Sequence, residues 1–119
     1  MESFTDLIAW KKGMELVQDV YRLSNSFPRE ELYALTAQLR KASTSILANT
    51  AEGFGRFTYA DKANKYTIAR GECAEVQAFM WIAASLGFIK QENAEEIVKK
   101  AQEVGRILSG LITACKRTR

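Results

Sequence analysis

The chain contains no histidine, so the most common general base and metal ligand is missing from its chemistry. Without imidazole there is no Ser–His or Cys–His nucleophilic pair, and no Glu-x-x-His motif of the kind that binds two metal ions inside helical bundles. The GxxxxGK[ST] and GxGxxG phosphate loops are also absent. The sequence therefore predicts a protein that is not an enzyme and that needs no metal ion or other cofactor.

Cysteine, proline and long apolar runs are scarce as well. Cys73 and Cys115 are too few for a zinc cluster or a disulfide framework, and we interpret both as small buried residues in a reducing compartment. A single proline leaves little room for long loops. No apolar run is long enough to span a bilayer, and residues 1–10 lack the features of a signal peptide. These absences predict a cytoplasmic protein with no membrane partner.

What the sequence does contain is the three- and four-residue spacing of apolar side chains that is typical of amphipathic helices. This spacing covers residues 5–24, 29–52, 58–86 and 91–115, and no segment alternates with period two for long enough to form a convincing strand. The apolar positions are Leu7, Trp10, Met14, Val17 and Tyr21, widened by Leu16, Val20 and Leu23; Leu32, Leu35, Leu39, Ala42 and Ile46; Tyr66, Ala69, Cys73, Val76, Met80 and Ala83; and Ile97, Ala101, Val104, Leu108, Leu111 and Cys115.

Local signals place the ends of these helices. Pro28 disfavours a helical Phe27 and opens the second helix, while Thr58 is a candidate N-cap of the third. Gly53 is expected to end the second helix in a left-handed conformation, and Gly87 to end the third. Four amphipathic helices with short connections predict an all-α protein, an antiparallel up-down-up-down four-helix bundle that forms a single domain over residues 1–119.

Some residues do not fit a simple bundle. Gly71, Gly105 and Gly110 fall inside predicted helices, where each costs about 1 kcal/mol relative to alanine, so we expect close helix contacts at these positions. A set of aromatic residues lies off the apolar stripes, namely Tyr33, Phe54, Phe57, Phe79, Trp81 and Phe88. Leftover apolar surface of this kind favours self-association, although a wider core stripe is the alternative.

A polar flank accompanies the apolar stripe of the second helix. Gln38, Ser45, Asn49 and Glu52 line it, and Arg70 lies on the corresponding flank of the third helix. We hypothesise that Arg70 pairs with Glu52 and that Asn49 satisfies nearby polar groups, since a half-buried charge needs such partners. Polar residues at a bundle seam usually set the register of the helices, so we favour this structural role over a ligand site.

Basic residues are the remaining candidates for function, and the chain has a net charge of +3. The candidate contacts to RNA or DNA phosphates are Arg40, Lys41, Arg56, Lys62, Lys65, Lys99, Lys100, Arg106, Lys116, Arg117 and Arg119. No RRM or KH signature is present, so recognition would depend on charge and shape. The alternative is an ordinary solvated surface, in which the cations that end the fourth helix complement its dipole.

Three stretches resemble a known family. They are FTDLIAWKKGMELVQDVY (4–21), FPREELYALTAQLRKASTSILANTAEGFGRF (27–57) and IARGECAEVQ (68–77). They are similar to the four-helix-bundle proteins encoded in bacterial 23S rRNA intervening sequences, a family that includes the accessory variability determinant of diversity-generating retroelements. The chain departs from the pattern at Leu47, where a proline is common, and at Glu72–Cys73. The resemblance implies a homo-oligomer, often a pentameric ring, and for some members a nucleic-acid role.

Two functions are compatible with these observations. The first is a non-catalytic RNA-binding or ribonucleoprotein accessory factor. The second is a homo-oligomeric structural adaptor that binds a protein partner and no nucleic acid. The salt dependence of binding distinguishes them, because contacts to phosphates weaken steeply as salt rises.

Overall fold

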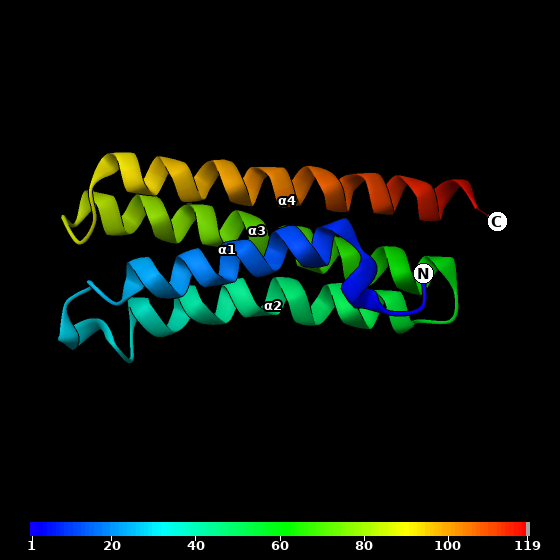
Figure 1. Cartoon of the computed structure of the whole chain (residues 1–119), viewed down its shortest axis with the longest axis horizontal. Coiled ribbons are helices and arrows are strands. Elements are labelled where there is room, and N and C mark those ends of the chain that lie inside the picture. Colours follow the sequence, from blue (N-terminus) through cyan, green and yellow to red (C-terminus); the bar gives the residue numbers. More distant parts are fainter. Residues whose placement is uncertain (119) are drawn as a thin grey trace.

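The protein is an antiparallel bundle of four long helices, seen in a computed structural model that describes residues 1–118 (Figure 1). The helices are α1 (Ile8–Ser24), α2 (Leu35–Gly55), α3 (Tyr59–Ser85) and α4 (Gln91–Arg117). Two short 3₁₀ helices, η1 (Phe4–Asp6) and η2 (Arg29–Glu31), precede α1 and α2. The bundle measures 48 × 23 × 20 Å, and no strand occurs within residues 1–118. The predicted all-α four-helix bundle is confirmed.

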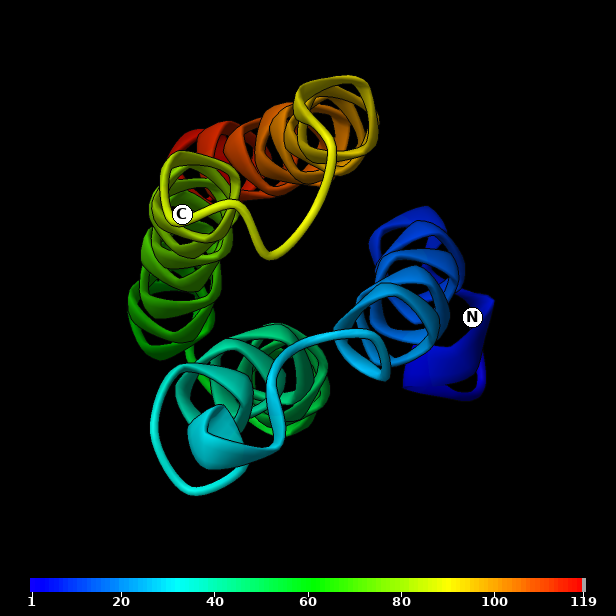
Figure 2. The same cartoon turned by 90° about the vertical axis from the view of Figure 1, so that its left-hand side faces the viewer.

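Each helix packs against the next one in the chain, and α1 also contacts α4. Seen end-on in Figure 2, the helices occupy four corners around a common interior. Contacts of α3 with α2 and α4 are the most extensive, whereas α1 is joined less extensively to both of its neighbours. No helix among residues 1–118 has the length and apolar character needed to cross a bilayer.

The core side chains largely follow the predicted stripes. All six predicted positions of α3 are buried, and four of the six on α4 are buried, with Leu111 and Cys115 partly exposed. The prediction for α1 is confirmed in part. Leu7, Leu16 and Val20 are buried as predicted, whereas Tyr21 is exposed and the inward face also includes Ala9 and Gly13. This face is favoured because its small residues let α1 approach α2 closely. The side chains that are almost completely inaccessible include Leu16, Leu39, Ile46, Met80, Ile97 and Leu108.

The second helix differs most from its prediction. The chain forms the turn η2 after Pro28, Leu32 is exposed, and α2 begins only at Leu35. The backbone at Ala34 is far from helical (φ −122°, ψ −106°), which separates η2 from α2. At the other end α2 runs through Gly53 to Gly55, so the expected left-handed stop at Gly53 is wrong.

The predicted ends of α3 are confirmed. The Thr58 hydroxyl accepts a hydrogen bond from the backbone N–H of Asp61 at 3.1 Å, as an N-cap does. Gly87 has a φ of 78°, and the backbone N–H of Phe88 donates to the carbonyl of Ala83 at 2.9 Å. This is the hydrogen-bond pattern of a Schellman motif, in which glycine accommodates the left-handed turn.

Close helix packing accounts for two glycines at which the sequence did not predict such a contact. A Cβ at Gly53 would lie 2.6 Å from the Tyr66 ring, and one at Gly13 would lie 2.7 Å from Leu47 Cδ2. Both glycines therefore allow a neighbouring helix to approach.

The glycines that were expected to mark close helix contacts behave differently. Gly71 and Gly110 have no described atom within 4 Å of an added Cβ, and at Gly105 the nearest atom, Cys73 Cβ, is at an ordinary 3.9 Å. The expectation of close helix contact is therefore wrong for Gly71 and Gly110. Inward and outward positions on a helix can be told apart only once its core face is known.

Candidate nucleic-acid interface

Arg40 is held by groups of the protein itself. Its Nε donates to the Ser24 hydroxyl at 2.9 Å, and a terminal nitrogen donates to Asn25 Oδ1 at 3.0 Å. The guanidinium also lies over the Tyr21 ring, 4.6 Å from its centroid. Arg40 therefore ties α2 to the end of α1 with two of its five N–H donors, and its predicted contact to phosphate stays a prediction.

Lys62 caps the end of α2. Its Nζ donates to the carbonyl of Phe54 at 2.6 Å and to that of Gly53 at 3.4 Å. These carbonyls belong to the last turn of α2, where they lack intrahelical partners and where the helix dipole favours a cation. Lys62 therefore stabilises the end of α2, and its predicted contact to phosphate stays a prediction.

The predicted Glu52–Arg70 pair is wrong. Glu52 Oε2 lies 3.0 Å from Lys65 Nζ and 3.5 Å from an Arg56 nitrogen, and the hydrogen bond and charge of Lys65 hold the pKa of this carboxyl below its usual value. Arg70 instead donates to the Ser109 hydroxyl of α4 at 3.3 Å. Because α3 starts directly after α2 and runs back along it, its early turns oppose Glu52, whereas Arg70 lies further on and faces α4.

The remaining members of the polar flank form no hydrogen bond to another helix within residues 1–118. Asn49 donates to the carbonyl of Ser45 within α2 at 2.9 Å. Gln38 and Lys41 border a groove whose α3 side carries Glu72 and Glu75. Burial raises the pKa of Glu72, and Glu75 raises it further, while Lys41 lowers it. Lys41 therefore faces carboxylates, which is an unfavourable setting for phosphate.

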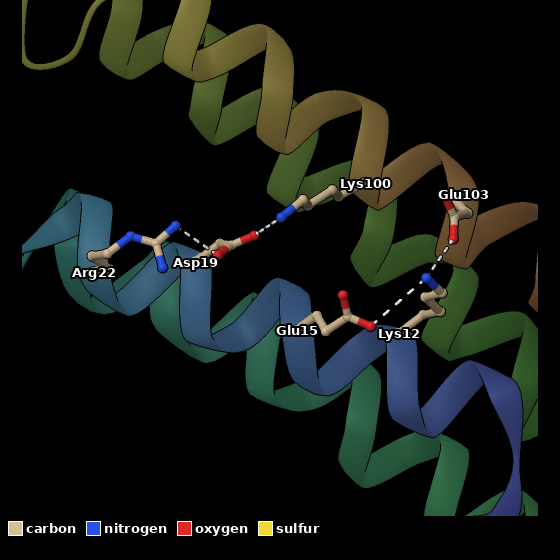
Figure 3. Close-up of polar contacts among 6 residues, drawn as sticks. All are labelled: Lys12, Glu15, Asp19, Arg22, Lys100 and Glu103. Carbon is tan, nitrogen blue, oxygen red and sulfur yellow. Dashed lines mark hydrogen bonds and ion pairs between the residues drawn. The ribbon is translucent and has the colours of Figure 1, made fainter.

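Lys100 belongs to a polar seam between α1 and α4 (Figure 3). Its Nζ donates to Asp19 Oδ2, and Arg22 donates to Asp19 Oδ1 at 2.7 Å. Asp19 is buried; burial raises its pKa, but the hydrogen bonds from Lys100 and Arg22 outweigh this effect and leave the pKa below its ordinary value. The same contact with Asp19 raises the pKa of Lys100. Lys100 is therefore a structural cation.

The seam continues with a more exposed set of charges. Lys12 Nζ lies 3.7 Å from Glu15 Oε2 on its own helix and 3.6 Å from Glu103 Oε1 on α4 (Figure 3). All three side chains are about half exposed, so water screens these pairs. The α1–α4 contact thus combines one buried charge cluster with weak surface pairs.

Five of the predicted cations are exposed and form no ion pair within residues 1–118. One is Lys41 on α2, and the other four, on α4, are Lys99, Arg106, Lys116 and Arg117. Arg119, which the sequence also nominated, lies outside the described residues.

Arg106 borders a shallow groove between α3 and α4, and Arg70 borders the same groove from α3. Its other polar side chains are Gln77, Gln102 and Ser109, and no carboxylate lines it. The sequence analysis assigned Arg70 to a pair with Glu52 and did not place it beside Arg106 on this groove. The useful signal is that residues 102, 106 and 109 share one face of a helix, as do residues 70 and 77.

The cysteines differ from each other. Cys73 is buried, and burial followed by the charge of Glu72 raises the pKa of its thiol to about 12, so it is a weak nucleophile at neutral pH. Cys115 is only partly buried, which corrects the interpretation that both are buried. Both thiols are free.

Apolar surface remains outside the core. Phe57, in the turn between α2 and α3, is 99% exposed, and Tyr33, just before α2, is 93% exposed. Trp81 on α3 is also exposed, whereas Phe54, Phe79 and Phe88 are partly buried. The core therefore absorbs about half of the off-stripe aromatic residues.

Comparison with known proteins identifies the family. Residues 5–110 match the profile of the 23S rRNA-intervening sequence proteins. No curated protein matches the chain. A crystal structure of a protein of unknown function from the S23 ribosomal protein family of Bacteroides thetaiotaomicron has a TM-score of 0.82 and 24% identity, covering 89% of this chain and 96% of that one. At this identity the likeness shows the fold alone.

These matches do not bear on the resemblance to the accessory variability determinant of diversity-generating retroelements, which stays a prediction. The family profile, by contrast, matches almost the whole chain and leaves out only its first few and last few residues. The chain belongs to the family of 23S rRNA-intervening sequence proteins.

Proposed function

We propose that this protein is a non-catalytic, cytoplasmic RNA-binding or ribonucleoprotein accessory factor that uses the α3–α4 groove to contact phosphates. The observation that supports this is the placement of Arg70 and Arg106 on one groove with no carboxylate lining it. Guanidinium groups match phosphate geometry, and the amides of Gln77 and Gln102 can donate further hydrogen bonds. The family takes its name from intervening sequences of 23S rRNA, which favours RNA over DNA.

The other exposed cations extend this surface. Lys99 and Arg117 lie on the same side of α4 as Arg106, because their spacings from it correspond to about two and three helical turns. Lys116 neighbours Arg117 at the end of the helix. By contrast, Arg40, Lys62 and Lys100 are occupied within the fold. A row of unpaired cations on one helix would follow a phosphate backbone without reading bases.

The proposal includes self-association, with a pentamer as the state implied by the family resemblance. Exposed Phe57 and Tyr33 support it, because apolar side chains this accessible are often covered by a neighbouring copy. Several copies would repeat the α3–α4 groove, so modest contacts in each would sum to a higher affinity. Multi-angle light scattering that finds only monomers would contradict this part.

Substitution of both groove arginines tests the RNA-binding proposal. We expect Arg70→Ala/Arg106→Ala to weaken RNA binding roughly tenfold, since two charge-assisted contacts are lost. The slope of log K against log salt should become shallower by roughly 1.4 for single-stranded RNA, about 0.7 for each contact. The measurement is fluorescence anisotropy with structured and unstructured RNA over a salt series.

Lys11→Ala/Lys90→Ala is the matched control, because it removes the same charge from exposed positions of the chain outside the groove. It should leave the salt slope close to that of the unmodified protein. Equal slopes for the two double variants would contradict the groove as the interface. Salt-insensitive capture of a protein partner without retained RNA would instead favour a structural adaptor, for which the exposed Phe57 and Tyr33 offer a contact surface.

A further inference from the structure

A second basic pocket lies between the linker that joins α1 to α2 and the first turns of α2. Its volume is about 210 Å³, several times the roughly 30 Å³ that one water molecule occupies in the liquid. The residues that line it are Ser24, Asn25, Phe27, Pro28, Arg29, Leu32, Thr36 and Arg40. Two are arginines and none is a carboxylate, so the pocket has the charge of an anion site.

Thr36 is the unusual member of this pocket. It is only 3% exposed, yet its hydroxyl makes no hydrogen bond to another described residue. No side-chain oxygen or nitrogen within residues 1–118 is both fully inaccessible and unpaired, so the Thr36 hydroxyl must meet solvent through the pocket that it lines. Other buried hydroxyls, such as that of Thr50, donate to a carbonyl of their own helix. The Thr36 hydroxyl therefore faces the pocket with no protein partner within residues 1–118, so it is available to water or to a ligand.

Arg40 enters this pocket already oriented. Ser24 and Asn25 accept hydrogen bonds from it, and the Tyr21 ring supports one face of its guanidinium. Both acceptors line the pocket beside it. The remaining N–H donors of the guanidinium are free, and they are held in place before any ligand arrives.

The start of α2 adds to the positive character of this region. Ala34, at the N-cap position, provides no side-chain acceptor, and the backbone N–H groups of Thr36 and Ala37 have no hydrogen-bond partner among residues 1–118. Glu31 accepts from the N–H of Leu35 at 3.2 Å, which places that carboxylate on the helix backbone. The dipole of the 21-residue helix favours an anion at this end.

We propose that this pocket binds a phosphate monoester, with Arg29 and Arg40 balancing its charge of nearly −2 and the Thr36 hydroxyl donating a hydrogen bond to a phosphate oxygen. The group can come from the terminal phosphate of an RNA strand or from a small phosphorylated molecule or free phosphate. The site shares no residue with the α3–α4 groove, so it does not depend on the function proposed above.

Thr36→Val tests this proposal, because valine keeps the shape of threonine and removes only the hydroxyl. Inorganic phosphate is titrated into the full chain by isothermal calorimetry, at an ionic strength held constant with sodium chloride. We expect saturable binding that Thr36→Val weakens roughly tenfold, the value of a hydrogen bond to a charged group. The melting temperature without phosphate should change little, since the hydroxyl that is removed faces the pocket and makes no hydrogen bond to another described residue.

Two further variants separate this site from general charge effects. Arg29→Ala changes an exposed residue and should weaken phosphate binding while the fold is kept. Arg106→Ala, with the same change of charge in the other groove, should leave phosphate binding unchanged. Equal affinity of the unmodified protein, Thr36→Val and Arg29→Ala, or no saturable binding of phosphate, would overturn the proposal.

A pair of oligoribonucleotides with and without a 5′-phosphate distinguishes the two sources. Tighter binding of the phosphorylated strand, lost in Thr36→Val but kept in Arg106→Ala, supports an RNA end as the ligand. Equal binding of both strands, together with Thr36-dependent binding of inorganic phosphate, supports a small phosphorylated ligand. Weak RNA binding in the α3–α4 groove variants with phosphate binding intact would affect only the proposal for that groove.

Discussion

Asp19→Ala is expected to lower the free energy of unfolding by about 2 kcal/mol, because a buried carboxylate loses two charge-assisted hydrogen bonds. Asp19 is buried between α1 and α4 and accepts hydrogen bonds from Lys100 and Arg22. Alanine would remove both bonds, while Lys100 and Arg22 are exposed enough to be hydrated without it. Urea denaturation followed by circular dichroism measures the difference.

The effect should depend on pH in a defined direction. The pKa of Asp19 is lower in the folded chain than in the unfolded one, so ionised Asp19 stabilises the fold at all pH values above its ordinary pKa of about 3.9. That stabilisation is lost as pH falls from there through the lower, folded pKa. The stability gap between the unmodified protein and Asp19→Ala should therefore be constant near neutral pH and should close in acid.

Glu103→Gln is the matched control, since it removes the charge of another α1–α4 ion pair. Glu103 and its partner Lys12 are each nearly half exposed, so this change should cost less than about 0.5 kcal/mol. If Glu103→Gln destabilised the bundle as much as Asp19→Ala, burial would not be what distinguishes the two pairs.

Gly53→Ala is expected to destabilise the fold by about 2 kcal/mol. The new Cβ would lie 2.6 Å from one atom of the Tyr66 ring and 2.8 Å from the next, and Tyr66 is buried and cannot swing away freely. Overpacking of this kind costs up to about 3 kcal/mol, which exceeds the roughly 1 kcal/mol that alanine gains over glycine inside a helix. Thermal and urea unfolding report the loss.

Gly71→Ala provides the opposite case. Gly71 is also inside a helix, but nothing described lies within 4 Å of its added Cβ, so only the gain in helix propensity remains. We expect it to stabilise the chain by roughly 0.5–1 kcal/mol. Loss of stability at Gly71 would instead indicate that another copy of the chain packs there.

The fold was largely predictable, because the spacing of apolar residues along the sequence matches the buried faces of the helices. On α3 every predicted position is buried, since this helix is packed between α2 and α4 and its inner face has a single orientation. On α1 two adjacent stripes compete, and the sequence alone does not show that the face with Ala9 and Gly13 is the one that fits against α2. The late start of α2 depends on the non-helical backbone at Ala34, and the residue types around Ala34 do not predict that conformation.

The candidate sites were predictable only in part. Spacing can place a cation on a helix, but its partner depends on how neighbouring helices are aligned. Lys62 and Lys100 were therefore counted as free, although one caps α2 and the other pairs with Asp19. For the same reason Arg70 was assigned to Glu52 instead of to the groove beside Arg106. The pocket around Thr36 was missed, because an unpaired hydroxyl has no signature in a sequence.

The way α1 is attached also bears on the order in which the bundle comes apart. α1 has the least extensive interhelical contacts, and the cations of its ion pairs with α4 are about half exposed to water. The other three helices share a larger continuous apolar interface. In native-state hydrogen exchange, amide protons of α1 should accordingly be released at a lower opening energy than those at the centre of α3. Opening of α1 would expose apolar side chains of the other helices, and exposed surface of this kind favours aggregation.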